Sequence, residues 1–171
     1  QEWQTGHVLT ALSVWEQNGI ANHYFSPVWT FNNPADKITN SLGGVKDKEG
    51  YTYYVSYPPF SFILPYFVFK ITGQDVSVVG IRVFSLLIHF ICALLIFLIV
   101  YKFSKKRLNE DYFIPAYVAF CFYVFATGNL WFHSHFYFAD SLVHIFVLGL
   151  IYVFLSILQQ PETKTSKNIF L

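Results

Sequence analysis

The chain has 171 residues, of which 54% are hydrophobic and only 12% charged, with a mean hydropathy of +0.43. Soluble domains carry about 25% charged residues, so this composition excludes an ordinary soluble domain and favours an integral membrane protein. The net charge of +1 comes without a basic stripe, which excludes a nucleic-acid partner. The lipid bilayer is the first expected partner.

The first 75 residues are expected to form an extracytoplasmic loop. The sequence opens on Gln1 and contains no Met, so we expect an N-terminal part of the protein to be missing. The stretch "GHVLTALSVWEQNG" predicts an amphipathic helix with Val8, Leu12 and Trp15 on one face, resting on the membrane. Further on, "VKDKEGYTYYVSY" predicts a small hairpin with its turn near residues 47–50.

A short apolar stretch over residues 60–71, "FSFILPYFVFKI", follows Tyr57-Pro58-Pro59. A helix of about 12 residues is too short for the bilayer core, which takes about 17–25. Pro65 inside the stretch and Lys70 near its end weaken a spanning interpretation further. We therefore expect a short interfacial helix there.

Three longer apolar runs predict transmembrane helices over residues 81–101, 112–132 and 141–158. Cys92 and Cys121 lie inside these runs and are expected to pack as small hydrophobic side chains. The predicted fold class is an all-α polytopic membrane protein. It consists of an extracytoplasmic loop (residues 1–75) and a transmembrane region (residues 76–171), and is a fragment of a longer chain.

Basic residues predict the orientation of these spans. "KFSKKR" follows the first span, and Lys164 and Lys167 follow the third. Short loops rich in Lys and Arg stay cytoplasmic. Two crossings then separate Glu2 from Asp140, so both acids are expected on the extracytoplasmic face.

Both acids are candidates for general-base chemistry, because desolvation raises the pKa of a carboxyl group toward neutrality. Each of the two acids also has a purely structural interpretation. Asp140 precedes "SLVHIF" and suits the N-cap of the third span, and Glu2 suits an exposed charge. Arg82, at the start of the first span, suits either a phosphate or an interaction with lipid headgroups.

The order of the motifs resembles the N-terminal part of class C glycosyltransferases that use polyprenyl-phosphate sugars, such as protein O-mannosyltransferases and aminoarabinose transferases. In order, the motifs are "QEWQTGHVLTAL", "YPPFSFILPYFVFKITG", "VVGIRVFSLLI" ending in "KKR", and "FYFADSLVHIF". They cover nearly all of residues 1–158. The chain departs from the family at Gln1, where the family has Asp, and at Tyr57, where relatives often have a basic residue.

The resemblance implies transfer of a sugar from a polyprenyl-phosphate donor to an acceptor hydroxyl or similar nucleophile on a protein, lipid or glycan. Glu2 would be the base and Asp140 the second acid, while Arg82, His7 and Tyr57 would bind substrate or phosphate. No metal and no separate cofactor is implied, and no Asp-X-Asp triplet occurs. The expected location is a bacterial cell membrane, with the site on the extracytoplasmic face.

Two other functions remain open from the sequence. In a transporter or channel subunit, Asp140 and the nearby histidines would relay protons. In a metal-dependent membrane enzyme, His133, His135 and Asp140 would bind the ion, with His144 spaced to share a face with Asp140. This spacing matches no known zinc signature, and histidines at the membrane interface are the simpler interpretation.

Overall fold

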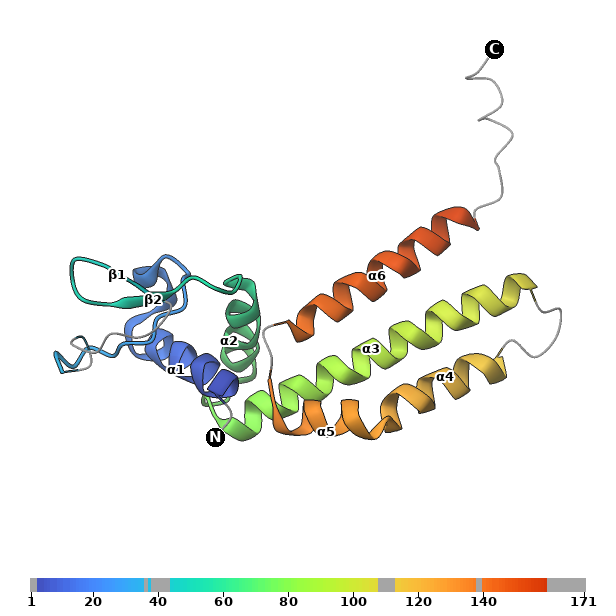
Figure 1. Ribbon diagram of the computed structural model, residues 1–171, viewed down its shortest axis with the longest axis horizontal. Helices are drawn as coiled ribbons and strands as arrows, with labels where there is room; N and C mark the ends of the chain where they lie inside the picture. Colours follow the sequence, from blue (N-terminus) through green and yellow to red (C-terminus); the bar gives the residue numbers. More distant parts are fainter. Residues whose placement is uncertain (1–2, 36, 38–43, 108–112, 138–139, 160–171) are drawn as a thin grey trace, which may run out of the picture. The chain divides into compact units, whose positions relative to one another are not determined.

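The structure is a computed structural model that describes residues 3–35, 37, 44–107, 113–137 and 140–159. The chain forms two compact units (Figure 1). The first comprises Gln1–His89 and Thr127–Leu142, and the second comprises Phe90–Ala126 and Val143–Leu171. The expected boundary at residue 75, between an outer loop and a membrane region, stays a prediction.

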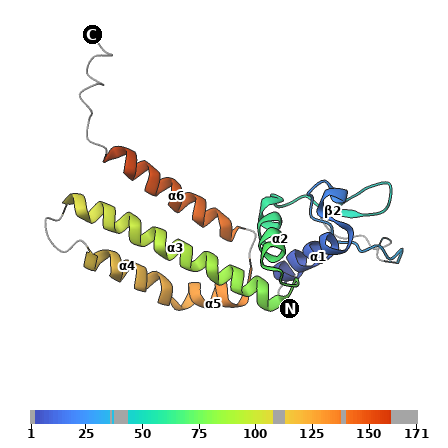
Figure 2. The ribbon, with the colours of Figure 1, turned by 180° about the vertical axis from the view of Figure 1, so that it is seen from behind.

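Helix α1 (Trp3–Asn18) packs against helix α2 (Phe60–Thr72) in the first unit, and the two lie side by side in both views (Figures 1 and 2). Val8, Leu12 and Trp15 do share a face, but they are at most 1% exposed. The Trp15 ring lies edge-on to Tyr66 of α2, with 5.5 Å between centroids. The expectation that this face rests on the membrane is therefore wrong, because the protein itself covers it.

A small antiparallel hairpin follows a single 3-10 turn, η1 (Ile20–His23). Strand β1 (Gly44–Lys46) pairs with β2 (Thr52–Tyr54), and Asp47 organises the turn between them. The Asp47 carboxylate accepts hydrogen bonds from the backbone N–H groups of Glu49 and Tyr51, both at 2.9 Å. The hairpin lies where the sequence predicted it.

Helix α2 begins after Pro58-Pro59 and has 13 residues. At 1.5 Å per residue it is about 20 Å long, shorter than the bilayer core of about 30 Å. Gly73 ends it at a φ of +67°, and the N–H of Gln74 bonds back to the Phe69 carbonyl at 3.1 Å. The length of the observed helix agrees with the sequence prediction.

Within the described residues, two helices are long and apolar enough to cross a membrane, namely α3 (Val78–Arg107) and α6 (Ser141–Leu158). The uninterrupted helix expected over residues 112–132 is instead two helices, α4 (Phe113–Phe125) and α5 (Thr127–His135), bent by 50°. The prediction of one continuous helix is wrong here, since Thr127-Gly128-Asn129 are weak helix formers at the break. Counted as one broken span, this pair is a third candidate by length and composition.

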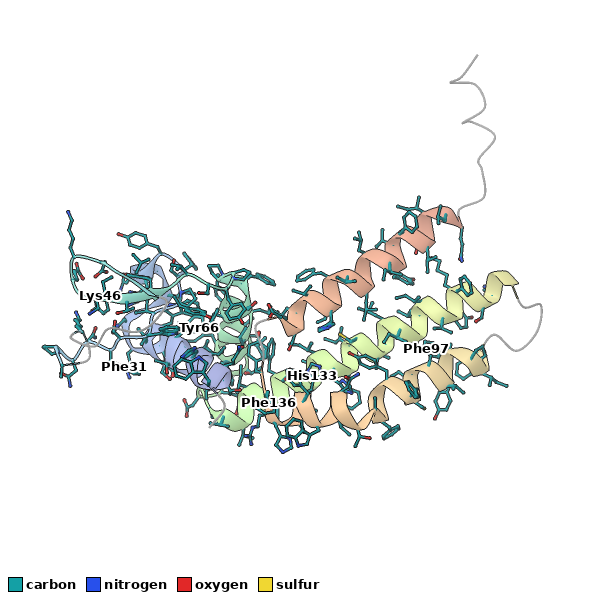
Figure 3. All side chains as sticks on the ribbon, viewed as in Figure 1. Phe31, Lys46, Tyr66, Phe97, His133 and Phe136 are labelled. Atoms are coloured by element: carbon teal, nitrogen blue, oxygen red, sulfur yellow. The ribbon has the colours of Figure 1, made fainter. Side chains whose placement is uncertain are left out.

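In the second unit, the later part of α3 packs against α4 and α6. Phe97 of α3 (Figure 3) lies edge-on to Phe113 of α4, with ring centroids 5.6 Å apart. The Lys102 ammonium group hydrogen-bonds the Ser156 hydroxyl, and the Lys102 carbonyl accepts from the Gln159 side chain at 3.1 Å. These polar contacts join α3 to the C-terminal end of α6.

Candidate functional site

Aromatic rings surround His7 in the first unit. The His7 ring lies 4.3 Å from the Trp3 ring and 4.2 Å from the Trp29 ring, measured between centroids. Trp29 stacks in turn on Tyr54 at 4.2 Å. Burial lowers the pKa of His7, so its imidazole is neutral at pH 7 and carries one N–H donor.

Tyr57 joins the same aromatic cluster from the segment after β2. Its ring lies 5.6 Å from Tyr54, and its hydroxyl accepts a hydrogen bond from the Gln4 side chain at 3.4 Å. Two of the predicted substrate-binding residues, His7 and Tyr57, therefore belong to one cluster with Tyr54 close to both.

Arg82 and His7 line one cavity of about 590 Å³. The Arg82 Nε donates to the backbone carbonyl of His135 at 3.2 Å, which anchors the guanidinium group. Arg82 is the only charged side chain among the described residues that line this cavity, so the cavity suits an anionic group. Its lining residues are Trp3, Thr5, Gly6, His7, Leu9, Thr10, Val78 and Arg82.

Tyr137, three residues before Asp140 in the sequence, contacts both α1 and α2. The Tyr137 side chain is fully buried. Its backbone N–H donates to the Thr5 hydroxyl at 3.1 Å, and its phenol hydroxyl donates to the Ser61 carbonyl at 2.7 Å. Thr5 also lines the Arg82 cavity. The Tyr137 backbone is thereby attached to the wall of that cavity.

Asp140 itself is exposed and directly precedes α6. Burial raises the pKa of Tyr54, and the Asp140 charge adds to this rise. Glu2, the other predicted acid, lies outside the described residues, while its neighbour Trp3 lines the Arg82 cavity.

The two histidines of α5 lie in different environments. His133 is buried and faces α3 (Figure 3), where its Nδ1 hydrogen-bonds the Ser85 hydroxyl at 3.1 Å and its ring lies 5.1 Å from His89. His135 is exposed and stacks on Trp131 at 5.2 Å. Within the described ranges, no three His, Cys, Asp or Glu side chains are grouped closely enough to bind a metal ion.

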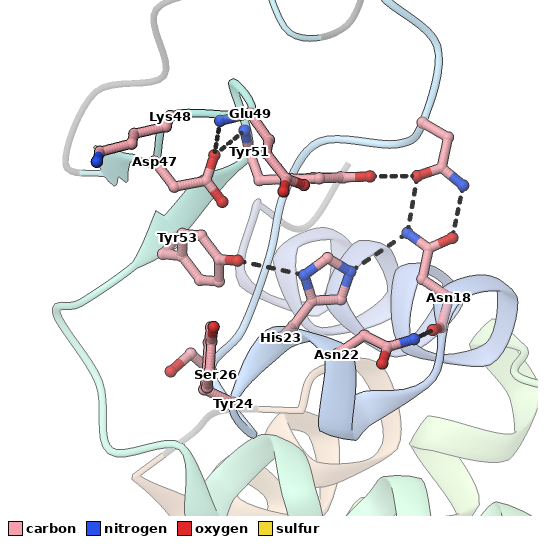
Figure 4. A pocket seen from close by; sticks show the side chains of 11 residues that line it. Asn18, Asn22, His23, Tyr24, Ser26, Asp47, Lys48, Glu49, Tyr51 and Tyr53 are labelled. Atoms are coloured by element: carbon pink, nitrogen blue, oxygen red, sulfur yellow. Dashed lines mark hydrogen bonds between the residues drawn. The ribbon is translucent and has the colours of Figure 1, made fainter.

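Sequence reasoning missed a second cavity, of about 640 Å³, in the loop between α1 and α2 (Figure 4). The sequence signal was the density of Asn and Tyr residues between Asn18 and Tyr53, part of which lies in the predicted hairpin. The cavity is lined by Asn18, Asn22, His23, Tyr24, Ser26, Asn32, Asp47, Lys48, Glu49, Tyr51 and Tyr53.

No protein-family profile, curated protein or solved structure matches this chain. The resemblance to class C glycosyltransferases therefore rests on the order of the chain's own motifs. The cavity beside Arg82 supplies the geometry on which a function can be proposed.

Proposed function

We propose that this chain is the N-terminal part of a membrane glycosyltransferase that moves a sugar from a polyprenyl-phosphate donor to an extracytoplasmic nucleophile. The observation that carries the proposal is the cavity shared by Arg82 and His7. Two residues that the resemblance implies for substrate or phosphate binding line one anion-suited space. Tyr137, three residues before Asp140, is attached to the wall of that space through Thr5.

In the proposed reaction, an acceptor hydroxyl attacks the anomeric carbon of the lipid-linked sugar. A new C–O bond forms to the acceptor as the bond between the anomeric carbon and the phosphate oxygen breaks. Glu2 takes the hydroxyl proton as general base, and Asp140 orients the acceptor or the base. The polyprenyl phosphate leaves with an added negative charge, which the Arg82 guanidinium stabilises.

The Trp3 ring suits the polyprenyl chain of the donor. Trp3 lies at the edge of the cavity and is 70% exposed, which is unusual for so large an apolar ring in a soluble context. Such rings favour the boundary between water and lipid. A polyprenyl chain could extend into lipid while its phosphate stays near Arg82, with the site at the extracytoplasmic surface of the membrane.

Replacement of each acid tests the proposal. In the full-length enzyme, Glu2→Gln or Asp140→Asn is expected to lower the turnover of sugar transfer about 100-fold or more, because the first removes the base and the second removes the acid that orients the acceptor or the base. Asp75→Asn, at an exposed acid between α2 and α3, is the matched control and should keep wild-type turnover. Wild-type rates in both acid variants would refute the assignment of the base.

A proton-coupled transporter or channel subunit is the second candidate. It is favoured by the buried pair His89 and His133, whose rings lie 5.1 Å apart. The Ser85 hydroxyl bonds to the His133 Nδ1 and donates to the Phe136 carbonyl at 2.8 Å. Buried ionisable residues in membrane helices often mark proton pathways. This candidate predicts proton flux or solute uptake in proteoliposomes without any lipid-linked sugar, and His133→Phe should abolish it.

A further inference from the structure

We propose that the cavity between the end of α1 and the β1–β2 hairpin is a binding site for an uncharged oligosaccharide. This inference goes beyond the proposed glycosyl transfer and does not depend on it. The cavity of about 640 Å³ falls in the range that accommodates small ligands. Its lining is dominated by amide and phenol groups, which pair with sugar hydroxyls as both donors and acceptors.

A hydrogen-bonded network holds these polar groups in fixed orientations (Figure 4). His23 lies between Tyr53 and Asn18, with its Nδ1 3.3 Å from the Tyr53 hydroxyl and its Nε2 3.3 Å from the Asn18 amide nitrogen. Asn18 and Asn32 exchange two amide hydrogen bonds, at 3.1 and 2.6 Å. The hydroxyl of Tyr51 donates to Asn32 at 2.6 Å. A preorganised network lowers the ordering cost of binding a polar ligand.

The network leaves donors available to a ligand. Each Asn amide group carries two N–H donors. Asn32 uses one toward Asn18, and Asn22 uses one toward the Asn18 carbonyl at 2.6 Å. The remaining N–H groups of Asn22 and Asn32 can bind sugar hydroxyls without breaking any bond of the network.

Tyr24 supplies an aromatic surface at the cavity. Its side chain is 84% exposed, and its backbone has a φ of +52°, a left-handed conformation that bulky residues rarely adopt. Phe25 follows with a φ of +58°. Such strained positions cluster at binding and catalytic sites. An exposed tyrosine ring beside fixed amides matches the two sides of a sugar, whose C–H face packs on aromatic rings while its hydroxyls bond to amides.

Charge restricts the class of sugar. Among the described residues, the carboxylates of Asp47 and Glu49 line the cavity together with one ammonium group, that of Lys48. His23 adds no positive charge at neutral pH, because burial lowers its pKa. Two carboxylates disfavour uronic acids and sugar phosphates. The expected ligand is therefore a neutral oligosaccharide.

Saturation-transfer NMR tests the inference on the full-length protein in nanodiscs, without any lipid-linked sugar. The probes are cellobiose, maltose and N,N′-diacetylchitobiose, with cellobiuronic acid as the anionic comparison. At least one neutral disaccharide should bind and the uronic acid should not. Because no donor is present, this result is independent of whether the protein transfers sugar.

Paired variants at the two strained residues locate the site. Tyr24→Ala should raise the Kd about tenfold, equivalent to about 1.4 kcal/mol, since it removes the aromatic surface. Phe25→Ala removes a neighbouring exposed ring that does not line the cavity and should leave the Kd unchanged. Tyr24→Trp keeps an aromatic surface and should retain binding. This variant distinguishes the loss of a ring contact in Tyr24→Ala from misfolding of the loop.

Three results would overturn the inference. The first is no binding of any neutral disaccharide up to tens of millimolar. The second is equal loss of affinity in Tyr24→Ala and Phe25→Ala. The third is tighter binding of the uronic acid than of its neutral counterpart.

Discussion

Arg82 makes a backbone contact and lines a cavity at the same time. Its Nε bonds to the His135 carbonyl, which anchors the side chain beside the anion-suited space. A guanidinium group presents several donors in a rigid plane, whereas a lysine ammonium is a flexible point charge. The identity of this residue should therefore matter as much as its charge.

For Arg82→Lys in the full-length enzyme, we expect the KM for the lipid-linked donor to rise about tenfold, equivalent to about 1.4 kcal/mol of lost binding. Steady-state transfer assays at varied donor concentration measure this. Lys105→Ala, which removes a cation from the second unit, is the control and should leave the KM unchanged. An unchanged KM in Arg82→Lys would argue against a phosphate at this position.

His23 should make stability depend on pH. Burial lowers its pKa and Lys37 contributes to this, while Asp47 and Glu49 act in the opposite direction. The imidazole therefore binds a proton more readily in the unfolded chain than in the folded one. Its contribution to stability is complete above its unfolded pKa of about 6.5 and is lost as the pH falls through the lower folded value.

The thermal midpoint (Tm) of the first unit should consequently decrease as the pH is lowered from 7.5 to 5. His23→Gln removes the titrating group and should flatten the decline, with His7 accounting for what remains because its pKa is also lowered. Thermal melts across this pH range measure the effect. The same slope in the variant and the wild type would exclude His23 as its source.

At the scale of elements, Gly80 permits the close approach of α3 to α2. A Cβ atom at this position would lie 2.4 Å from the Phe69 Cε1. Real side chains do not tolerate this distance, so any larger residue must displace a ring that is only 6% exposed. Gly80 is thus a packing residue of the first unit.

Gly80→Ala is expected to destabilise the first unit by about 1–3 kcal/mol through overpacking. Gly149→Ala is the matched control, because nothing lies within 4 Å of the added methyl group and the substitution should be neutral or slightly stabilising. Thermal melts in detergent compare the two. If Gly80→Ala were as stable as the control, the contact between Phe69 and Gly80 would not be tight in the folded protein.

The sequence predicted the positions of helices better than the surfaces they contact. Apolar runs mark α3 and α6 because a helix long enough to cross lipid needs such a run. The apolar stripe of α1 fits lipid and protein equally well, so the sequence could not show that α2 covers Trp15. The apolar run also gave no sign of the bend at Ala126, because the bend depends on the low helix propensity of the residues there.

In the candidate site, too, the sequence indicated single residues better than the contacts between distant residues. Arg82 and Asp140 could be found from the sequence, because charges at the ends of apolar runs are conspicuous. The cluster that brings His7 near Tyr57 depends on Trp29 and Tyr54 from the loop, a distant contact that no local period reveals. The cavity beside His23 depends on an amide network and escaped prediction for the same reason.

At the scale of the whole molecule, the proposal requires the loop and Asp140 to share the extracytoplasmic face. In a background without Cys92 and Cys121, single cysteines can be introduced as Lys48→Cys, Asp140→Cys and Lys105→Cys. The first two should react with a membrane-impermeant maleimide in intact cells, and the third only after permeabilisation. Labelling of Lys48→Cys and Asp140→Cys from opposite sides would contradict the topology.

The most direct test of the account is the fate of a polyprenyl-phosphate sugar given to the purified full-length protein with a mixture of membrane lipid and glycan acceptors. If the protein transfers sugar, polyprenyl phosphate should accumulate in step with transferred sugar, and both products should fall about 100-fold in Asp140→Asn. Intact donor after prolonged incubation with wild-type protein, alongside proton flux in proteoliposomes without donor, would contradict glycosyl transfer and favour the transporter.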